Sequence, residues 1–336
     1  MPPPPPPRDP GRRQRRSRQP REPRRTGRRR GLAWRVAKWA VLAVAGWTAL
    51  SVVLFLFSAQ FLQDRVPSSA RAQLEAPGEV IGVGFGIPAI LNRPEGVVAA
   101  APHLPLEGVR FQDMMAERLD RPVAIDNDGN CTMLAEWRHG VAQGASDALM
   151  LTVGTGIGGG IVSNGEMVRG STGGGAEIGH MVIDIDGPPC RCPGHGHYEW
   201  YASGRAIGRA GEDAAERHPD SALGKAHAEG REITGALVTE LAHDGDELAV
   251  AAIALVGERL GLGMVSLVNI FNPEVIAIGG GAVAAGDLLL GPAREVVETQ
   301  ALPSMRSAVR IVPARFGSDA GLIGAATLAF EELSPK

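Results

Sequence analysis

A dense group of potential metal ligands and proton acceptors lies between residues 177 and 199. Its members are Glu177, His180, Cys190, Cys192, His195, His197 and Glu199. Four of them, His180, Cys190, Cys192 and His197, are spaced closely enough along the chain to surround one ion. Thiolate and imidazole are the ligands that tetrahedral zinc prefers, and four protein donors leave no open coordination position. The sequence therefore predicts a structural Zn²⁺ site.

A glycine-rich stretch precedes this group. The apolar run 149–153 breaks into Gly154-Thr155-Gly156-Ile157-Gly158-Gly159-Gly160 and resumes at Ile161 and Val162, a pattern typical of two β-strands joined by a bend. Glycine takes positive φ and has no Cβ, so backbone N–H groups in such a bend can close around a phosphate. A purely structural hairpin uses the same composition, and the pattern by itself leaves both interpretations open.

Three motifs resemble the signature of the ROK family, which contains bacterial sugar kinases and sugar-responsive repressors. They are the glycine stretch 154–160, the sequence Gly175-Ala176-Glu177-Ile178-Gly179-His180, and the sequence from Cys190 to Glu199. The resemblance runs from about Val80 to Leu333, roughly three quarters of the chain. It implies an α/β protein with the two-lobed actin/hexokinase (ribonuclease H-like) architecture. The implied activity is ATP-dependent phosphorylation of a hexose, most like that of a glucokinase.

The resemblance also implies where ATP and zinc bind. ATP would lie between two glycine segments, with Mg²⁺ bridging its phosphates: Gly154, Thr155, Gly156, Gly158 and Gly159 on one side, and Gly279, Gly280 and Gly281, which hold the adenosine, on the other. His180 would bind zinc through one nitrogen and the sugar through the other. Most family members have a third cysteine where this chain has His197. Because His195 is only two residues away, it is the competing fourth ligand.

Asp128 is the candidate catalytic base. The apolar segment 122–125 predicts a strand that brings Asp126-Asn127-Asp128 to its carboxyl end, where open α/β sheets bind ligands. Asn127-Asp128 matches the Asn-Asp pair of the family. A sugar hydroxyl is a poor nucleophile at neutral pH, so a carboxylate that accepts its proton favours phosphoryl transfer. Alternatively, Asp128 caps the helix expected over 130–140.

Glu177, His180 and Glu199 are the candidate sugar ligands, and Asn127 is expected to hold the hydroxyls near the reacting one. A hexose presents several hydroxyls that donate and accept, and carboxylates with an imidazole satisfy them in a fixed pattern. The same side chains could instead be solvated surface groups.

Strands and helices expected around these residues divide the domain into two lobes. Strands are expected at 80–88, 273–278 and 309–312. An amphipathic helix is expected with Phe111, Met114, Met115 and Leu119 inside, and further helices are expected at 203–217, 233–242, 248–270, 286–299 and 320–333. By the resemblance, 80–88 is the fourth strand of a small lobe whose preceding strands carry an Asp-x-Gly-Gly-Thr phosphate hairpin. That motif is absent from the chain, so we expect a truncated small lobe of residues 80–126 plus 319–333, a large lobe of 127–318, and reduced turnover.

Charge is divided unevenly along the chain. Residues 1–38 carry 14 basic and two acidic side chains, a net charge of +12, which leaves −15 for the rest of a chain whose formal total is −3. Residues 2–7 are all proline, and 8–30 are mostly Arg, Pro, Gly, Gln and Ser. Such a segment cannot bury enough apolar surface to fold, so we expect a disordered tail over 1–38. We expect it to bind no nucleic acid, because no aromatic residue is interleaved with the arginines before Trp34.

Residues 39–63 contain no charged side chain and are long enough to cross about 30 Å of hydrocarbon as one helix. A cleaved signal peptide is the alternative, but its apolar core would be shorter. The arginine-rich flank predicts that the N-terminus is cytoplasmic and that everything after Asp64, including the linker 64–79, is outside. The segment resembles the membrane anchor of LytR-CpsA-Psr envelope proteins.

The predicted topology conflicts with the cysteines and with the need for ATP. Cys190 and Cys192 are too close for an ordinary disulfide framework and, with Cys131 the only other cysteine, indicate a reducing compartment. An external kinase would have no ATP. Either the topology is inverted, or the domain no longer phosphorylates, or a gene fusion or faulty gene model joined the N-terminal segment to a cytoplasmic kinase. We favour the third explanation.

Three function classes follow from these observations. The favoured one is a sugar kinase. The second is a non-catalytic sugar sensor, although nothing between residues 1 and 78 has the helix-turn-helix pattern of the family's repressors. The third is a membrane-anchored envelope protein that binds glycan. The apolar spacing within 248–270 indicates either core packing or a homodimer contact.

Overall fold

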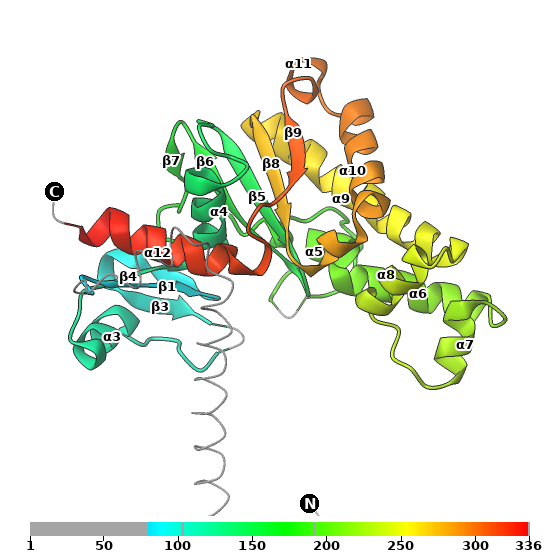
Figure 1. The fold of residues 1–336 in the computed structure, drawn as a ribbon, viewed down its shortest axis with the longest axis horizontal. Coiled ribbons are helices and arrows are strands. Elements are labelled where there is room, and N and C mark those ends of the chain that lie inside the picture. Colours follow the sequence, from blue (N-terminus) through cyan, green and yellow to red (C-terminus); the bar gives the residue numbers. More distant parts are fainter. Residues whose placement is uncertain (1–79, 102–103, 191, 335–336) are drawn as a thin grey trace, which may run out of the picture. The chain divides into compact units, whose positions relative to one another are not determined.

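The computed structural model describes residues 80–101, 104–190 and 192–334, which belong to one compact unit. The predicted tail 1–38, membrane segment 39–63 and linker 64–79 lie outside the described residues and stay predictions. Within the compact unit the chain contains both strands and helices, as the sequence predicts (Figure 1).

The small lobe contains two pairs of strands and one helix. Strand β1 (Val83–Ile87) is parallel to β4 (Val123–Asn127), and β2 (Ile90–Asn92) is antiparallel to β3 (Val97–Ala100). Helix α3 (Phe111–Leu119) packs on them, with the ring of Phe111 edge-on to Phe85 at 5.4 Å between centroids. Leu119 was expected on the inner face of this helix but is 41% exposed, because the helix ends there.

The large lobe is built on a five-stranded sheet in the order β7-β6-β5-β8-β9. The central strand β5 (Ala148–Val153) is antiparallel to β6 (Ile157–Ser163) and parallel to β8 (Val275–Gly279). The short strand β7 (Glu166–Met167) extends one edge, and β9 (Arg310–Pro313) the other.

Alternating residues of β5 enter two different cores. Leu149, Leu151 and Val153 pack with the helices on one face, which are α5 (Tyr198–Ala202), α6 (Gly204–Arg217), α7 (Ala222–Ala228), α8 (Gly235–His243), α9 (Glu247–Phe271) and α10 (Asp287–Gln300). Ala148 and Met150 pack on the other face with α4 (Asp128–His139) and α12 (Ala320–Leu333). Because both faces are covered, β5 is an apolar run without polar alternation.

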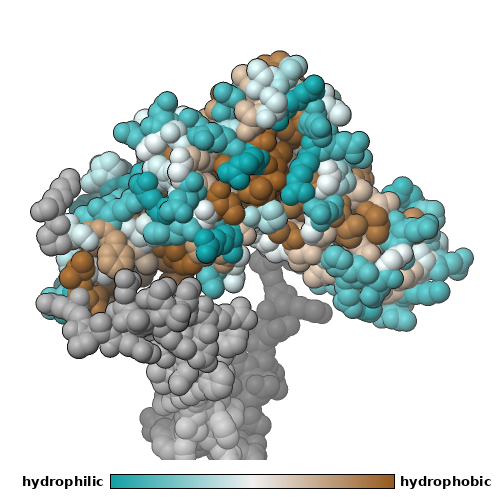
Figure 2. Space-filling view, turned by 45° about the horizontal axis from the view of Figure 1, so that its top comes forward, coloured by the Kyte–Doolittle hydropathy of each residue, from teal (hydrophilic) through white to brown (hydrophobic). Residues whose placement is uncertain are grey.

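Short elements connect the lobes and the sheet. They are the 3₁₀ turns η1 (Arg93–Glu95), η2 (Ile178–His180), η3 (Gly281–Ala285) and η4 (Gly317–Asp319), and helix α11 (Pro303–Arg306). On the face shown in Figure 2, hydrophilic residues cover most of the described surface, and hydrophobic residues form several patches between them, one of them near the middle.

Among the described residues, one helix, α9, is long and apolar enough to cross a membrane. Half of its apolar window is buried inside the protein, where Ile253, Leu260 and Met264 are fully covered by neighbouring helices. Its composition therefore reflects a core helix, which is one of the two interpretations of its apolar spacing.

Helix α12 lies between the small-lobe strand β1 and helix α4 (Figure 1). The approach is close enough that a Cβ on Gly324 would collide with the carbonyl oxygen of Cys131, and a Cβ on Gly84 with that of Ala325. The expectation that 320–333 returns to pack on the small lobe is confirmed. The same helix also packs on α4 of the large lobe.

We predict that Gly324→Ala lowers the free energy of unfolding by about 1–3 kcal/mol, because the added methyl forces α12 away from α4. Gly321→Ala on the same helix is the control. Its Cβ would meet only Thr132 Oγ1, at 4.0 Å, so it should be neutral or stabilising by up to about 1 kcal/mol. Urea denaturation followed by circular dichroism measures both, and equal effects would contradict the tight contact.

Candidate functional site

The junction between β4 and α4 presents Asp128 at the carboxyl end of the strand. Asn127, not Asp128, is the N-cap of α4: its Oδ1 accepts hydrogen bonds from the backbone N–H of Gly129 (2.8 Å) and Asn130 (3.3 Å). The interpretation of Asp128 as the helix cap is therefore wrong. Asp128 is the first residue of the helix and is exposed, with one local hydrogen bond from Gly129 N–H at 3.0 Å.

The cap restricts what Asn127 can offer a sugar. Its Oδ1 serves the helix, and its Nδ2 donates to the carbonyl of Ala89 at 3.2 Å. Only the second N–H of that amide remains for a ligand. The sequence predicted a sugar contact here and missed the cap, although Asn is among the preferred residues at this position.

The glycine stretch forms a tighter turn than expected. The bend between β5 and β6 consists of Gly154, Thr155 and Gly156, closed by a hydrogen bond from Gly154 N–H to the Gly156 carbonyl at 2.9 Å. Gly158 and Gly159, expected in a phosphate loop, belong to strand β6. Gly159 is buried, and a Cβ there would collide with the backbone of Met150 and the side chain of Ile178. Close packing therefore explains why position 159 is glycine.

Glu199 lies against the tip of this hairpin. Its Oε2 accepts a hydrogen bond from Ile157 N–H at 3.3 Å, and a Cβ on Gly156 would collide with the same oxygen. Helix α5, which carries Glu199, therefore joins the hairpin to the predicted metal segment.

A cavity of about 1140 Å³ opens beside the hairpin. Gly154 and Thr155 line one side and Gly281 another, so two of the expected nucleotide segments meet there. Gly280, at φ 86°, lets the chain pass close to the backbone of Val153, whereas Gly279 is buried at the end of β8. Gly279 and Gly280, which were expected to hold the nucleotide, are therefore not among the residues that line the cavity.

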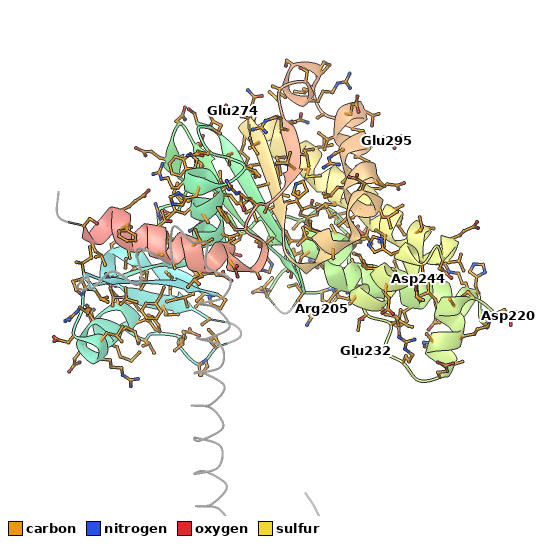
Figure 3. All side chains as sticks on the ribbon, viewed as in Figure 1. Arg205, Asp220, Glu232, Asp244, Glu274 and Glu295 are labelled. Carbon is orange, nitrogen blue, oxygen red and sulfur yellow. The ribbon has the colours of Figure 1, made fainter. Side chains whose placement is uncertain are left out.

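The rest of the cavity wall comes from residues that the sequence analysis did not identify. These include Arg205 from α6 and Arg231, Glu232 and Thr234 from the segment before α8; Arg205 and Glu232 are labelled in Figure 3. Ser203 and Thr234 cap α6 and α8 through hydrogen bonds to Ala206 N–H and Leu237 N–H. The sequence did contain a signal for these two helix N-termini, because Ser203 and Thr234 are preferred N-cap residues and each is followed by the first residue of a helix, Gly204 or Gly235. Helix N-termini attract anions such as phosphate.

The four predicted zinc ligands converge. One donor atom from each of His180, Cys190, Cys192 and His197 lies within 4.8 Å of the others. The Nδ1 atoms of His180 and His197 are 3.1 Å apart, and Cys192 Sγ is 3.8 and 3.7 Å from them. Two sulfurs and two imidazoles at this spacing fit a tetrahedral zinc ion.

His195 turns away from this cluster. Its Nε2 lies 2.9 Å from the carbonyl oxygen of Ile185. His197, by contrast, is 6% exposed, and burial, reinforced by the charge of His180, lowers the pKa of its imidazole. A neutral imidazole is the form that binds metal.

Glu177 lies in the electrostatic field of the other candidate residues. Desolvation by the surrounding protein raises the pKa of its carboxyl, even though the residue is exposed at the surface. The charge of His180 opposes this rise, and the carboxylates of Asp128 and Glu199 reinforce it. The fold therefore brings Asp128 of α4, Glu199 of α5, and Glu177 and His180 at the two ends of η2 into one electrostatic neighbourhood.

Comparison with known proteins decides the family. The ROK family model matches residues 58–332. The chain belongs to the ROK family. The match begins further toward the N-terminus than the expected Val80, and it overlaps the predicted linker and the end of the predicted membrane segment.

Members of the ROK family with different activities resemble this chain. The glucokinase of Halalkalibacterium halodurans is 34% identical over 264 residues, covering 78% of this chain and 80% of its own length. The xylose repressor of Caldicellulosiruptor bescii is 29% identical over 82% of this chain and 68% of its own length. Sequence similarity therefore extends to both kinases and repressors.

A solved structure shares the fold. The ROK family glucokinase from Streptomyces griseus, in complex with glucose and AMPPNP, has a TM-score of 0.68 and 31% identity, covering 81% of this chain and 88% of its own. The expected actin/hexokinase-like kinase fold is confirmed, and the chain is of the sugar-kinase type. Zinc, by contrast, stays a prediction supported by the donor geometry.

We predict that His197→Ala abolishes stoichiometric zinc binding, whereas His195→Ala retains it, because of these two histidines His197 is the one whose nitrogen lies in the donor cluster. Metal content per chain, measured by mass spectrometry after dialysis, tests both variants. Loss of zinc from the His195 variant alone would reverse the assignment.

We predict that Glu177→Gln raises the apparent melting temperature at neutral pH. Because the folded pKa of Glu177 lies above its ordinary value of 4.5, its contribution to stability is complete below that value and is lost as the pH rises through the folded pKa. The neutral amide removes this loss, so melts at about pH 4 should show no difference. Glu166→Gln, on the exposed strand β7, is the control, and a gain that persists in acid would contradict the explanation.

Proposed function

We propose that this chain is a glucokinase, which transfers the γ-phosphoryl group of ATP to a hydroxyl of glucose. One observation carries the proposal: the exposed carboxylate of Asp128 shares its surroundings with Glu177, His180 and Glu199, next to a cavity that begins at the same hairpin. A base, a set of sugar ligands and a nucleotide-sized space thus adjoin one another. The relative from Streptomyces griseus, whose complex contains glucose and AMPPNP, supports this arrangement.

The hairpin between β5 and β6 joins the two halves of the site. Glu199 approaches it from the side of the sugar ligands, and the cavity opens beyond Gly154 and Thr155. A nucleotide in the cavity can direct its phosphates along the hairpin, where backbone N–H groups and the N-terminus of α6 favour negative charge. The terminal phosphate then points toward the hydroxyl held near Asp128.

Asp128 acts on the hydroxyl during transfer. The sugar oxygen forms a bond to the γ-phosphorus as the bond from that phosphorus to the β,γ-bridging oxygen breaks, and ADP leaves with the electron pair. The hydroxyl proton passes to a carboxylate oxygen of Asp128. Glu177, His180 and Glu199 orient the ring by accepting and donating hydrogen bonds to its other hydroxyls. Bound Mg²⁺ would neutralise charge on the phosphates.

The proposed zinc site supports the sugar ligands rather than the chemistry. Zinc held by four protein donors has no position for substrate. Because His180 is both a member of the metal cluster and a neighbour of Glu177, the ion would fix the orientation of this imidazole.

A sugar sensor without catalysis is the competing proposal, and the similarity to xylose repressors favours it. A sensor needs the sugar ligands but neither a base nor a nucleotide cavity. The cavity beside the hairpin therefore favours the kinase.

We predict that Asp128→Asn lowers kcat for glucose phosphorylation by roughly 10²–10⁴-fold, because the amide cannot accept the proton. Glucose binding, measured by calorimetry, should be retained, since Asn keeps the size and polarity of the side chain. ADP release by the full-length chain measures turnover.

Asp120→Asn is the matched control, because Asp120 is exposed at the end of α3 in a left-handed conformation that Asn also favours. It should leave kcat unchanged. Wild-type protein that binds glucose but releases no ADP would favour the sensor, and an Asp128→Asn variant with normal turnover would exclude this base.

A further inference from the structure

The buried carboxylate of Asp126, two residues before Asp128, has no role in the chemistry described above. It is 2% exposed. Its Oδ1 accepts hydrogen bonds from Asn127 N–H at 2.8 Å and from Asn130 Nδ2 at 2.9 Å. Both donors belong to the start of α4, so this oxygen holds the backbone turn that presents Asp128.

The other oxygen of Asp126 faces two arginines from distant parts of the chain. Arg169 Nε donates to Oδ2 at 2.7 Å, and Arg93 Nε lies 3.7 Å away. Arg93 also donates to the carbonyl of Ile125 at 2.9 Å and pairs with Glu332 of α12. A buried carboxylate is costly unless it is paired and hydrogen-bonded, and here both oxygens are satisfied.

Arg169 begins the loop that leads to the candidate sugar ligands. Its carbonyl accepts a hydrogen bond from Gly175 N–H at 2.8 Å, which closes the loop 170–175 on itself. Gly173 lies so close to the carbonyl of Leu91 in β2 that a Cβ would collide with it. The loop thus contacts the small lobe at one end and, through Arg169, the junction of β4 and α4 at the other.

The backbone immediately after this loop is held in an unfavourable conformation. Ala176 has φ 67°, in the left-handed region, where a residue with a Cβ is uncommon. Its carbonyl accepts a hydrogen bond from Ile178 N–H at 2.7 Å. Such strain persists only where the surrounding structure imposes it. Because Glu177 is the next residue, the imposed conformation of Ala176 also fixes where the Glu177 side chain begins.

We propose that the Asp126–Arg169 ion pair positions the sugar-binding segment 175–180 relative to the catalytic base. The Asp126 carboxylate fixes two segments at once. Its Oδ1 holds the turn that presents Asp128, and its Oδ2 holds Arg169, which begins the loop leading to Glu177. Asp126 and Arg169 are positioning residues. The proposal rests on the proposed function for its effect on kinetics, and on the geometry alone for its effect on the loop.

Arg169→Met is the primary test, because Arg169 is 27% exposed and its loss disturbs the fold less than loss of the buried partner. We expect the KM for glucose to rise and kcat to fall, together lowering kcat/KM for glucose by about 10- to 100-fold, as misplacement of a substrate-orienting group by about 1 Å does. The KM for ATP should not change, since the nucleotide cavity lies on the far side of the hairpin. Arg169→Lys should restore part of the loss.

Arg138→Met is the matched control. Arg138 pairs with Glu331 of α12 and is 37% exposed, but it does not touch Asp126. It should leave both KM values and kcat unchanged. A general loss of stability would lower the active fraction in either variant, but it would not raise the KM for glucose while leaving the KM for ATP unchanged.

The double variant Asp126→Asn/Arg169→Met shows whether the two residues act as one unit. If they do, its kcat/KM for glucose equals that of the worse single variant. Independent effects would instead multiply, and that result would overturn the pair as the positioning element.

Hydrogen exchange of the full-length chain reads out the loop without any activity. Arg169→Met should speed amide exchange in 170–180 and leave exchange in η3 unchanged. If wild-type protein phosphorylates nothing while this exchange pattern is found, the kinase proposal fails and the positioning proposal stands. Unchanged exchange in 170–180 would overturn the positioning proposal, whatever the activity.

Discussion

A close backbone contact between helix α4 and strand β6 holds the candidate site together. Gly129 at the start of α4 lies against the carbonyl of Gly159, and Gly160 lies under Met133 of the same helix. A side chain at Gly129 or Gly160 would push the helix away from the sheet. Because Asp128 is the first residue of α4, and the hairpin tip is the continuation of β6, this contact sets the distance between the proposed base and the proposed phosphate-binding bend.

Packing and charge perform different tasks around this contact. The lobes are joined by α12, which packs tightly through Gly84 and Gly324 and carries Glu331 and Glu332 to arginines of α4 and η1. Exposed ion pairs of this kind add little stability. The buried Asp126 differs, because its charge cannot be left unpaired. Close packing therefore gives the unit its rigidity, whereas the buried pair adds orientation near the site.

The hairpin between β5 and β6 is the structural element that adjoins both halves of the proposed site. Its tip is short, so Glu199 reaches it from one side while the cavity opens on the other. The N-termini of α6 and α8 complete the cavity, with Arg205 and Arg231 in its wall. Kinases and repressors both occur among the relatives, so the hairpin geometry, rather than family membership alone, supports phosphoryl transfer.

The sequence by itself determined the family, many of the strands and helices, and the grouping of His180, Cys190, Cys192 and His197, because periodicity and motif spacing are local properties of the chain. It did not predict the short strands β2, β3 and β7 or helix α7. The helix 320–333 was predicted with the bounds observed for α12. Tertiary structure alone decided that Asn127 caps α4, that Gly159 is needed for packing, and that His195 turns away from the metal cluster. It also joined Asp126 to Arg169, 43 residues away. These contacts depend on which elements pack against one another across the sheet, and neither composition nor residue spacing predicts that packing.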